Sequence, residues 1–114
     1  MMNMQQITDE YMKEMLPKAK AYSMVILKPT SKIKEPGAEK IIWEHGRRNF
    51  ALRAEGIMPI VCPVPHYDEV AGVGIFTKST EETKAIMEED PGVIAGLFTF
   101  SVYACRSFPG DALK

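Results

Sequence analysis

The chain has 114 residues, which is long enough for one hydrophobic core and too short for two, so the sequence predicts a single domain over residues 1–114. With 46% hydrophobic and 25% charged residues, its composition is that of a globular protein. The formal net charge is -1, from 14 basic and 15 acidic side chains, so no positive field favours nucleic acid or an anionic membrane surface as a partner.

The N-terminal residues do not predict export. Residues 1–6 contain no basic stretch followed by a continuous apolar run. Secretory signals and membrane spans need such a run, so we expect neither, and we expect a cytoplasmic location.

The cysteines and the second histidine show no metal-ligand pattern. Cys62 and Cys105 fit no metal or redox spacing, and in a reducing compartment we expect both to be structural. His66 lies beside Asp68 and Glu69, but one histidine with adjacent acids lacks convergent spacing, so we interpret it as part of a surface loop. We therefore expect no metal and no cofactor.

The first predicted element is a short helix. Thr8 is a suitable N-cap, and Asp9 and Glu10 place acids in the first turn. Pro17 lacks a backbone N–H, so the helix is expected to end or bend there. Residues 1–20 are therefore predicted to be a helical extension in front of the core. Its apolar side chains recur at helical spacing: Tyr11, Met12, Met15 and Leu16.

A strand and a long helix follow. Residues 22–27 form a short apolar run ended by a proline, which is typical of a strand. Pro36 is expected to open the helix, because proline is preset for the first helical position. Gly56 suits the left-handed conformation at its C-terminal end. The inward face of this helix carries Ala38, Ile41, Ile42, His45, Asn49 and Leu52.

The next two predicted strands are rich in Ile, Val and Gly. Residues 57–64 contain prolines, which cannot donate to a ladder and favour an edge position. Residues 70–77 contain Gly72 and Gly74, which leave room on one face of the sheet for a bulky neighbour, either a helix or a ligand.

The last predicted helix and strand complete the core. Ser79 and Glu82 form a capping box that starts the helix, and the Asp90-Pro91-Gly92 sequence ends it and can start one further turn. Residues 97–106 alternate as a strand does. One face of this strand is apolar and carries Phe98, Phe100, Val102 and Ala104.

The predicted order is β-α-β-β-α-β after the leading helix, with the core at residues 21–106 and a tail at 107–114. This order is typical of an α+β, ferredoxin-like fold, an antiparallel sheet with both crossover helices on one face. The second and fourth strands are expected at opposite edges, too far apart for a disulfide between Cys62 and Cys105.

The face of the sheet without helices is expected to bury its side chains against a second copy. Leaving that face wet would expose apolar side chains, so the sequence predicts a symmetric homodimer. The residues expected to make this surface apolar are Val25, Leu27, Ile60, Ile75 and Phe76.

Three stretches of the core carry a family resemblance. Residues 45–56 begin with His and end in Ala-Glu-Gly, residues 79–83 read Ser-Thr-Glu-Glu-Thr, and residues 90–98 contain Asp-Pro followed by Ala-Gly and an apolar pair. In this order and spacing they resemble the YCII-related family of the dimeric α+β barrel superfamily, which also contains muconolactone isomerase. The resemblance implies that fold and a homodimer. Cys62 stands where the family has glycine, and the loop around His66 is shorter than in many members.

His45 is the principal candidate for chemistry. Its position on the inward helix face should bring the ring to the sheet, and an imidazole exchanges protons near neutral pH, most effectively when a carboxylate orients it. Asp90 is the natural partner. In the resembled family the matching histidine and aspartate are the proposed catalytic pair, which implies general acid/base chemistry on a small cyclic or aromatic molecule by a lyase or isomerase.

Simpler interpretations remain open for both residues. Asp90 before Pro91 fits an N-cap with a first-turn proline and needs no catalytic role. His45 fits a core histidine bonded to a backbone carbonyl. The same cleft would serve a non-catalytic module that binds a metabolite, and a structural homodimer would need no ligand.

Ser79 and Arg106 are secondary candidates for substrate binding. Ser79 is a helix cap first, and any contact with a ligand is a second role. Arg106, on the last strand, is placed either to reach an anionic substrate or to line the dimer surface. The adjacent pair Arg47 and Arg48 is expected to belong to a solvated helix face.

Overall fold

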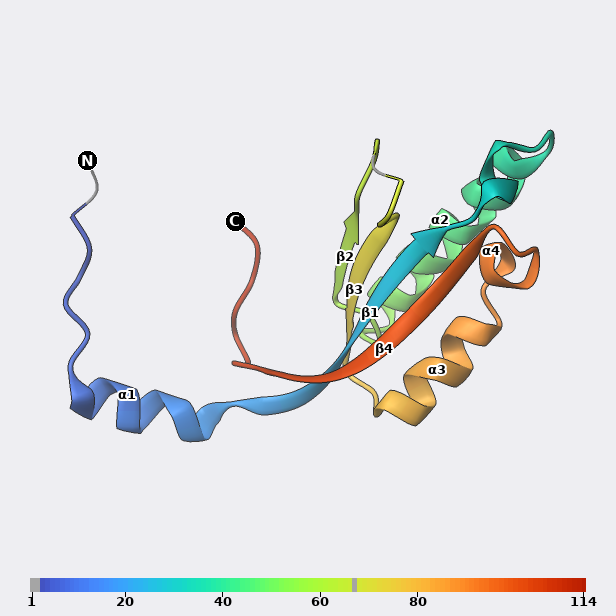
Figure 1. The fold of residues 1–114 in the computed structure, drawn as a ribbon. Coiled ribbons are helices and arrows are strands. Elements are labelled where there is room, and N and C mark those ends of the chain that lie inside the picture. Colours follow the sequence, from blue (N-terminus) through green and yellow to red (C-terminus); the bar gives the residue numbers. More distant parts are fainter. Residues whose placement is uncertain (1–2, 67) are drawn as a thin grey trace.

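One antiparallel sheet of four strands organises the chain, and the structure, a computed structural model, describes residues 3–66 and 68–114 (Figure 1). The strand order is β2-β3-β1-β4, which makes β2 and β4 the edge strands. The arrangement is α+β and is compatible with a ferredoxin-like fold. Cys62 and Cys105 lie on opposite edge strands, and both are free. The strands are β1 (Lys20–Pro29), β2 (Ile60–Pro63), β3 (Gly72–Phe76) and β4 (Phe98–Ser107).

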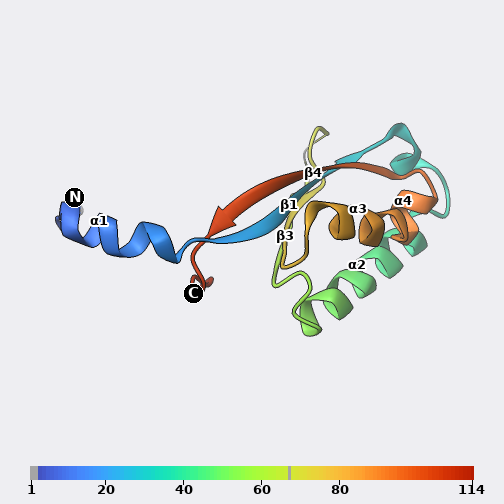
Figure 2. The same cartoon turned by 90° about the horizontal axis from the view of Figure 1, so that it is seen from below.

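Three helices cover one face of this sheet, as Figure 2 shows for α2 (Ala38–Ala54), α3 (Thr80–Glu88) and α4 (Pro91–Ile94). The core lies between this helical layer and the sheet, where burial of apolar surface stabilises the fold. No helix within the described residues is long and apolar enough to cross a membrane. Among the described residues the buried apolar side chains are Val25, Leu27, Ala38, Met58, Phe76, Met87, Leu97 and Phe98.

The start of α2 differs from the prediction. Gly37 has a φ of 87°, a left-handed conformation that breaks the helical path, so α2 begins at Ala38 and Pro36 is not its first residue. An unpredicted 3-10 helix, η2 (Ser31–Lys34), precedes it and is capped by Thr30. At the other end Gly56 has a φ of 72°, which confirms the predicted left-handed cap.

The second strand is shorter than the predicted residues 57–64. The N–H groups of Ile57 and Met58 donate to the carbonyl of Leu52, at 3.0 and 3.1 Å, and so close the end of α2 before β2 begins. Met58 then packs over β3. A Cβ atom on Gly74 would lie 2.5 Å from the Met58 sulfur, so this side chain fills the room that Gly74 leaves.

The two faces of the sheet divide the apolar residues differently from the prediction. Val25, Leu27 and Phe76 are 3%, 6% and 0% exposed beneath the helices, so they were wrongly assigned to the open face. Ile75 does belong to the open face, because it precedes the buried Phe76 on β3 and successive side chains point to opposite faces. Its direct partner Ile60 points to the same side. By the same register the open face carries Met24, Ile26, Ile60, Val73, Ile75 and Tyr103.

A two-stranded ribbon carries the N-terminal extension away from the sheet. β1 pairs with β4 from Lys20 to Pro29 but with β3 only from Ser23 to Leu27, so the ribbon runs past the other strands (Figure 1). At its end lie α1 (Asp9–Met15) and η1 (Leu16–Lys18), which bury no residue. The radius of gyration is 16.9 Å, against about 13 Å for a compact chain of this length.

Candidate functional site

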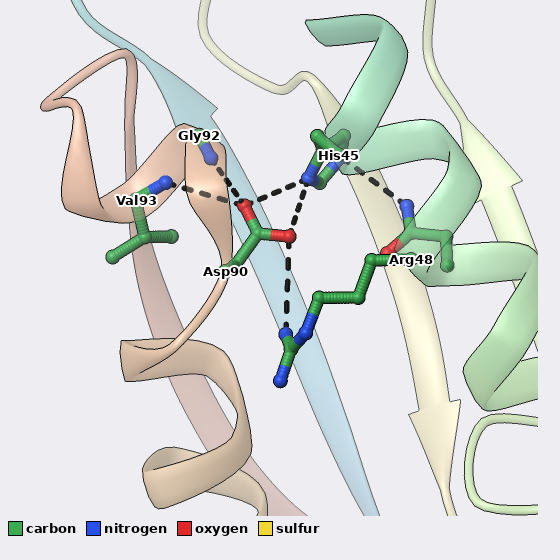
Figure 3. A network of polar contacts seen from close by, with 6 residues as sticks. His45, Arg48, Asp90, Gly92 and Val93 are labelled. Carbon is green, nitrogen blue, oxygen red and sulfur yellow. Dashed lines mark hydrogen bonds and ion pairs between the residues drawn. The ribbon is translucent and has the colours of Figure 1, made fainter. Parts of the chain in front are cut away.

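Asp90 is the N-cap of α4 and confirms the predicted capping role. Its backbone is extended, and its Oδ2 atom accepts hydrogen bonds from the N–H groups of Gly92, at 2.9 Å, and Val93, at 3.2 Å (Figure 3). Pro91 occupies the first helical turn, where its missing N–H has no cost. Only 1% of Asp90 is exposed, so a charged group is held in the interior and needs partners there.

His45 is the main partner of this carboxylate. Its Nδ1 atom lies 2.8 Å from both Oδ1 and Oδ2 of Asp90 (Figure 3). Carboxylate oxygens only accept, so Nδ1 carries a proton and donates it. The side chain of His45 is 12% exposed. The structure therefore brings together the two residues that the sequence singled out.

Asn49 lies one turn further along α2 and contacts the other ring nitrogen. Its Nδ2 atom is 3.2 Å from Nε2 of His45. With the ring proton on Nδ1, Nε2 of the neutral imidazole accepts this hydrogen bond. Both nitrogens are thus oriented, one by a carboxylate and one by an amide.

Arg48 places a positive charge beside Asp90. Its Nη1 atom lies 3.9 Å from Oδ1 of Asp90, and the side chain is only 24% exposed. The prediction that Arg48 belongs to a solvated helix face is therefore wrong. Within the described residues Nη1 is buried without a hydrogen-bond partner. Arg47 is exposed and pairs with Glu44 at 3.0 Å, as expected for a surface residue. The missed signal was the three-residue spacing from His45 to Arg48, which places both on one side of a helix.

Phe98 packs against the imidazole ring from β4. The two ring centroids are 4.9 Å apart, with a 43° angle between the planes. Gly92 permits this approach, because a Cβ atom there would lie 2.5 Å from the Phe98 ring. The ring of His45 is therefore held by packing as well as by hydrogen bonds.

A cavity of about 410 Å³ lies in front of His45, between α2 and the sheet. His45, Gly46 and Asn49 line its α2 side. Asp90 is not among the described residues that line it, so the carboxylate stands behind the ring. The described lining residues include no Lys, Arg, Asp or Glu. Apolar residues of the sheet side of the cavity include Val25, Leu27, Val61, Gly72, Gly74 and Phe76.

His66 is exposed in a turn, which confirms the predicted surface loop, and it also lines this cavity, which was not predicted. Its φ is 68°, a left-handed value that few residues other than glycine adopt. The sequence around it gave no periodicity from which to place it opposite α2.

Ser79 is the N-cap of α3, as predicted. Its hydroxyl accepts the N–H of Glu82 at 3.1 Å, and the N–H of Ser79 donates back to Oε1 of Glu82 at 3.4 Å, which completes the predicted capping box. Oε1 of Glu82 thus accepts the Ser79 N–H, and it also accepts the Ser79 hydroxyl at 3.0 Å. These bonds lower the pKa of the Glu82 carboxyl below its ordinary value. Ser79 is not among the described residues that line the cavity.

Arg106 is also not brought to His45. It is exposed and pairs with Ala21, in the ribbon beyond β3, and it is not among the described residues that line the cavity. The predicted contact of Arg106 with an anionic substrate therefore finds no support in this arrangement.

No three His, Cys, Asp or Glu side chains converge as a metal site within residues 3–66 and 68–114. Comparison of the sequence with models of known protein families found no match, and comparison with curated proteins found none either. The resemblance to the YCII-related family therefore stays a prediction.

Proposed function

We propose that the chain is a small-molecule enzyme, a lyase or isomerase, in which His45 is the general acid/base and Asp90 orients it. One observation carries the proposal: Nδ1 of His45 lies 2.8 Å from both oxygens of a buried carboxylate, while the same ring lines a cavity of about 410 Å³. A ring fixed in one tautomer beside an accessible hollow has the geometry that proton transfer requires.

The proposed reaction moves one proton through Nε2 of His45. A substrate that displaces the Asn49 amide would bring an acidic C–H or O–H to this nitrogen. Nε2 accepts the proton, and the electron pair left behind either shifts a double bond or expels a leaving group as an anion. The imidazolium formed is stabilised by Asp90, and it returns its proton to the product or to water.

The substrate proposed for this cavity is uncharged over most of its surface. The polar side chains that line it are few, and a charged group such as a phosphate would meet no cationic side chain among the described lining residues. A cyclic or aromatic molecule with one carbonyl or hydroxyl group, placed at His45 or at His66, fits this chemistry best.

We propose membership of the YCII-related family, a full ferredoxin-like topology, a cytoplasmic location and a homodimer formed through the open sheet face. The apolar side chains that this face carries, among them Met24, Ile26 and Ile75, support such a contact. Neither nucleic acid nor a membrane is proposed as a partner, given the near-zero net charge.

A non-catalytic metabolite-binding protein is the second candidate. The Asn49 amide already donates to Nε2 of His45, at 3.2 Å. In a protein that only binds its ligand, the Asn49 amide would be a hydrogen-bond donor to the ligand and Nε2 of His45 an acceptor from it. A purely structural homodimer is the third, and it predicts no ligand at all.

The three candidates differ in how the protein responds to small molecules. We expect uncharged lactones, hydroxyquinones and phenols to raise the melting temperature of the chain, and expect at least one of them to be converted. The His45→Ala variant should fold and keep its oligomeric state but lose turnover by at least about 100-fold. A converted compound whose turnover survives His45→Ala contradicts the proposal, and binding without conversion favours the second candidate.

A further inference from the structure

The outer side of α2 carries a stripe of residues spaced alternately four and three apart. At about 100° per residue they fall within an arc of about 80° on one side of the helix. Trp43 and Phe50 are 70% and 67% exposed, and Figure 2 shows α2 at the outer edge of the helical layer, away from the sheet. We call this set the α2 stripe: Glu39, Trp43, Gly46, Phe50 and Arg53.

Gly46 lies at the centre of the α2 stripe. A Cβ atom there would meet nothing within 4 Å, so the packing of this chain does not require glycine, although glycine inside a helix costs about 1 kcal/mol relative to alanine. The gap that it leaves between Trp43 and Phe50 is part of a hollow that Ile42 and Arg47 also line. The charge of Arg47 is paired with Glu44 of the same helix, at 3.0 Å. Such a gap lets a second helix approach closely.

We propose that the α2 stripe binds the α2 stripe of a second copy, antiparallel, about a two-fold axis near Gly46. In that orientation Trp43 meets the partner's Phe50, and Glu39 meets the partner's Arg53. A parallel orientation would instead set Glu39 against the partner's Glu39, which like charge disfavours. The opposite charges at the two ends of the α2 stripe thus select one geometry, and a two-fold contact uses the same surface on both copies.

The size of the α2 stripe sets the strength of this contact. Each aromatic side chain buries roughly 150–250 Å² when fully covered, and a stable interface buries about 1,200–2,000 Å² in total. Two tryptophans and two phenylalanines supply only part of that area, so the association is weak. It lies on the helical face, opposite to the sheet face proposed above for the homodimer, and does not depend on any reaction at His45.

A charge swap tests the proposal. Sedimentation velocity over a concentration series would compare the wild-type chain with Glu39→Arg, Arg53→Glu and the double variant. Each single change should weaken the association at least about tenfold, because it places like charges together twice across the axis. The association constant of the double variant should lie within about threefold of the wild-type value. Lys40→Glu, exposed on another side of α2, is the matched control and should change nothing.

Trp43→Lys should weaken this association more than either charge change, with an unaltered circular dichroism spectrum. Association unaffected by Trp43→Lys, or a double charge variant weaker than both single variants, would overturn the proposal. The N-terminal helix of another copy is the rival occupant. It would be identified by Leu16→Lys releasing the association as fully as Trp43→Lys, and that result overturns the helix-to-helix contact.

Discussion

α3 and α4 both begin with a side chain that accepts backbone N–H groups, yet the two caps lie in different surroundings. Ser79 is exposed, and its reciprocal partner is Glu82 of the same helix. Asp90 is 1% exposed, and its second partner is His45, which comes from α2. Ser79 bonds only within the start of α3, whereas Asp90 caps α4 and also links it to α2.

The comparison shows how a structural cap becomes a candidate site. A buried carboxylate is costly unless it is paired and hydrogen-bonded, and Asp90 meets that condition through backbone N–H groups, an imidazole and a nearby guanidinium. A serine at position 90 would cap α4 but would leave Nδ1–H of His45 without its carboxylate acceptor. Proton transfer is favoured by the negative charge of the Asp90 carboxylate, which would stabilise an imidazolium at His45, and not by the capping of α4 as such.

The largest effect is expected from Asp90→Ala. It removes the acceptor of two helical N–H groups and of Nδ1–H of His45, as well as the counter-charge of Arg48, so we expect a loss of about 3–5 kcal/mol in the free energy of unfolding. Urea denaturation followed by circular dichroism measures it. A loss no larger than that of Ser79→Ala would show that the two caps are equivalent after all.

Gly92→Ala should be next, because it pushes a Cβ atom into the Phe98 ring that packs on His45. We expect a loss of about 1–3 kcal/mol in the free energy of unfolding. In a Phe98→Ala background the same change should cost much less, which a double-mutant cycle would detect. Equal costs in both backgrounds would mean that the close approach of Gly92 to the ring does not matter.

Ser79→Ala should cost about 1 kcal/mol, the usual effect of losing an exposed N-cap. Thermal unfolding of the variant beside wild type is sufficient to measure it. Since Ser79 is not among the described residues that line the cavity, ligand binding should be unchanged. A weakened ligand affinity would give Ser79 the binding role that its position does not support.

The smallest effect concerns pH. Ser79 donates to the Glu82 carboxylate and lowers its pKa in the folded state, so this group stabilises α3 above its ordinary pKa of 4.5 and loses that contribution as pH falls through the lowered value. Glu82→Gln should flatten this part of the stability profile between neutral and acidic pH. An identical profile in the variant would remove Glu82 as a source of the acid sensitivity.

The fold was predictable where local signals were strong. Thr8, the capping box at Ser79, Gly56 and the alternation from Phe98 onward each fix backbone geometry through neighbours in sequence. The start of α2 was wrong because the left-handed backbone at Gly37 overrides the preference of Pro36 for a first turn. The assignment of sheet faces failed because it placed the neighbours Ile75 and Phe76 on one face, whereas successive side chains of a strand point to opposite faces.

The site was predictable only in its two principal residues. His45 and Asp90 were found from the helical stripe and from the family resemblance, and the structure places them in contact. Arg48 was missed, since its contact with Asp90 comes from α2 packing beside α4. His66 lies in a surface loop as predicted, but its place beside the cavity depends on a left-handed backbone that the sequence did not indicate. The pair Arg47 and Arg48 was predicted to belong to a solvated helix face, and this holds only for Arg47.

The most direct test is the tautomer of His45. The chain has two histidines, so nitrogen NMR of histidine-labelled protein, with His66→Gln for assignment, isolates the His45 ring. At alkaline pH, where an imidazole is neutral, the proton should reside on Nδ1, and Asp90→Asn should weaken this preference. A neutral His45 ring with its proton on Nε2 would contradict the orientation by Asp90 on which the proposed chemistry depends.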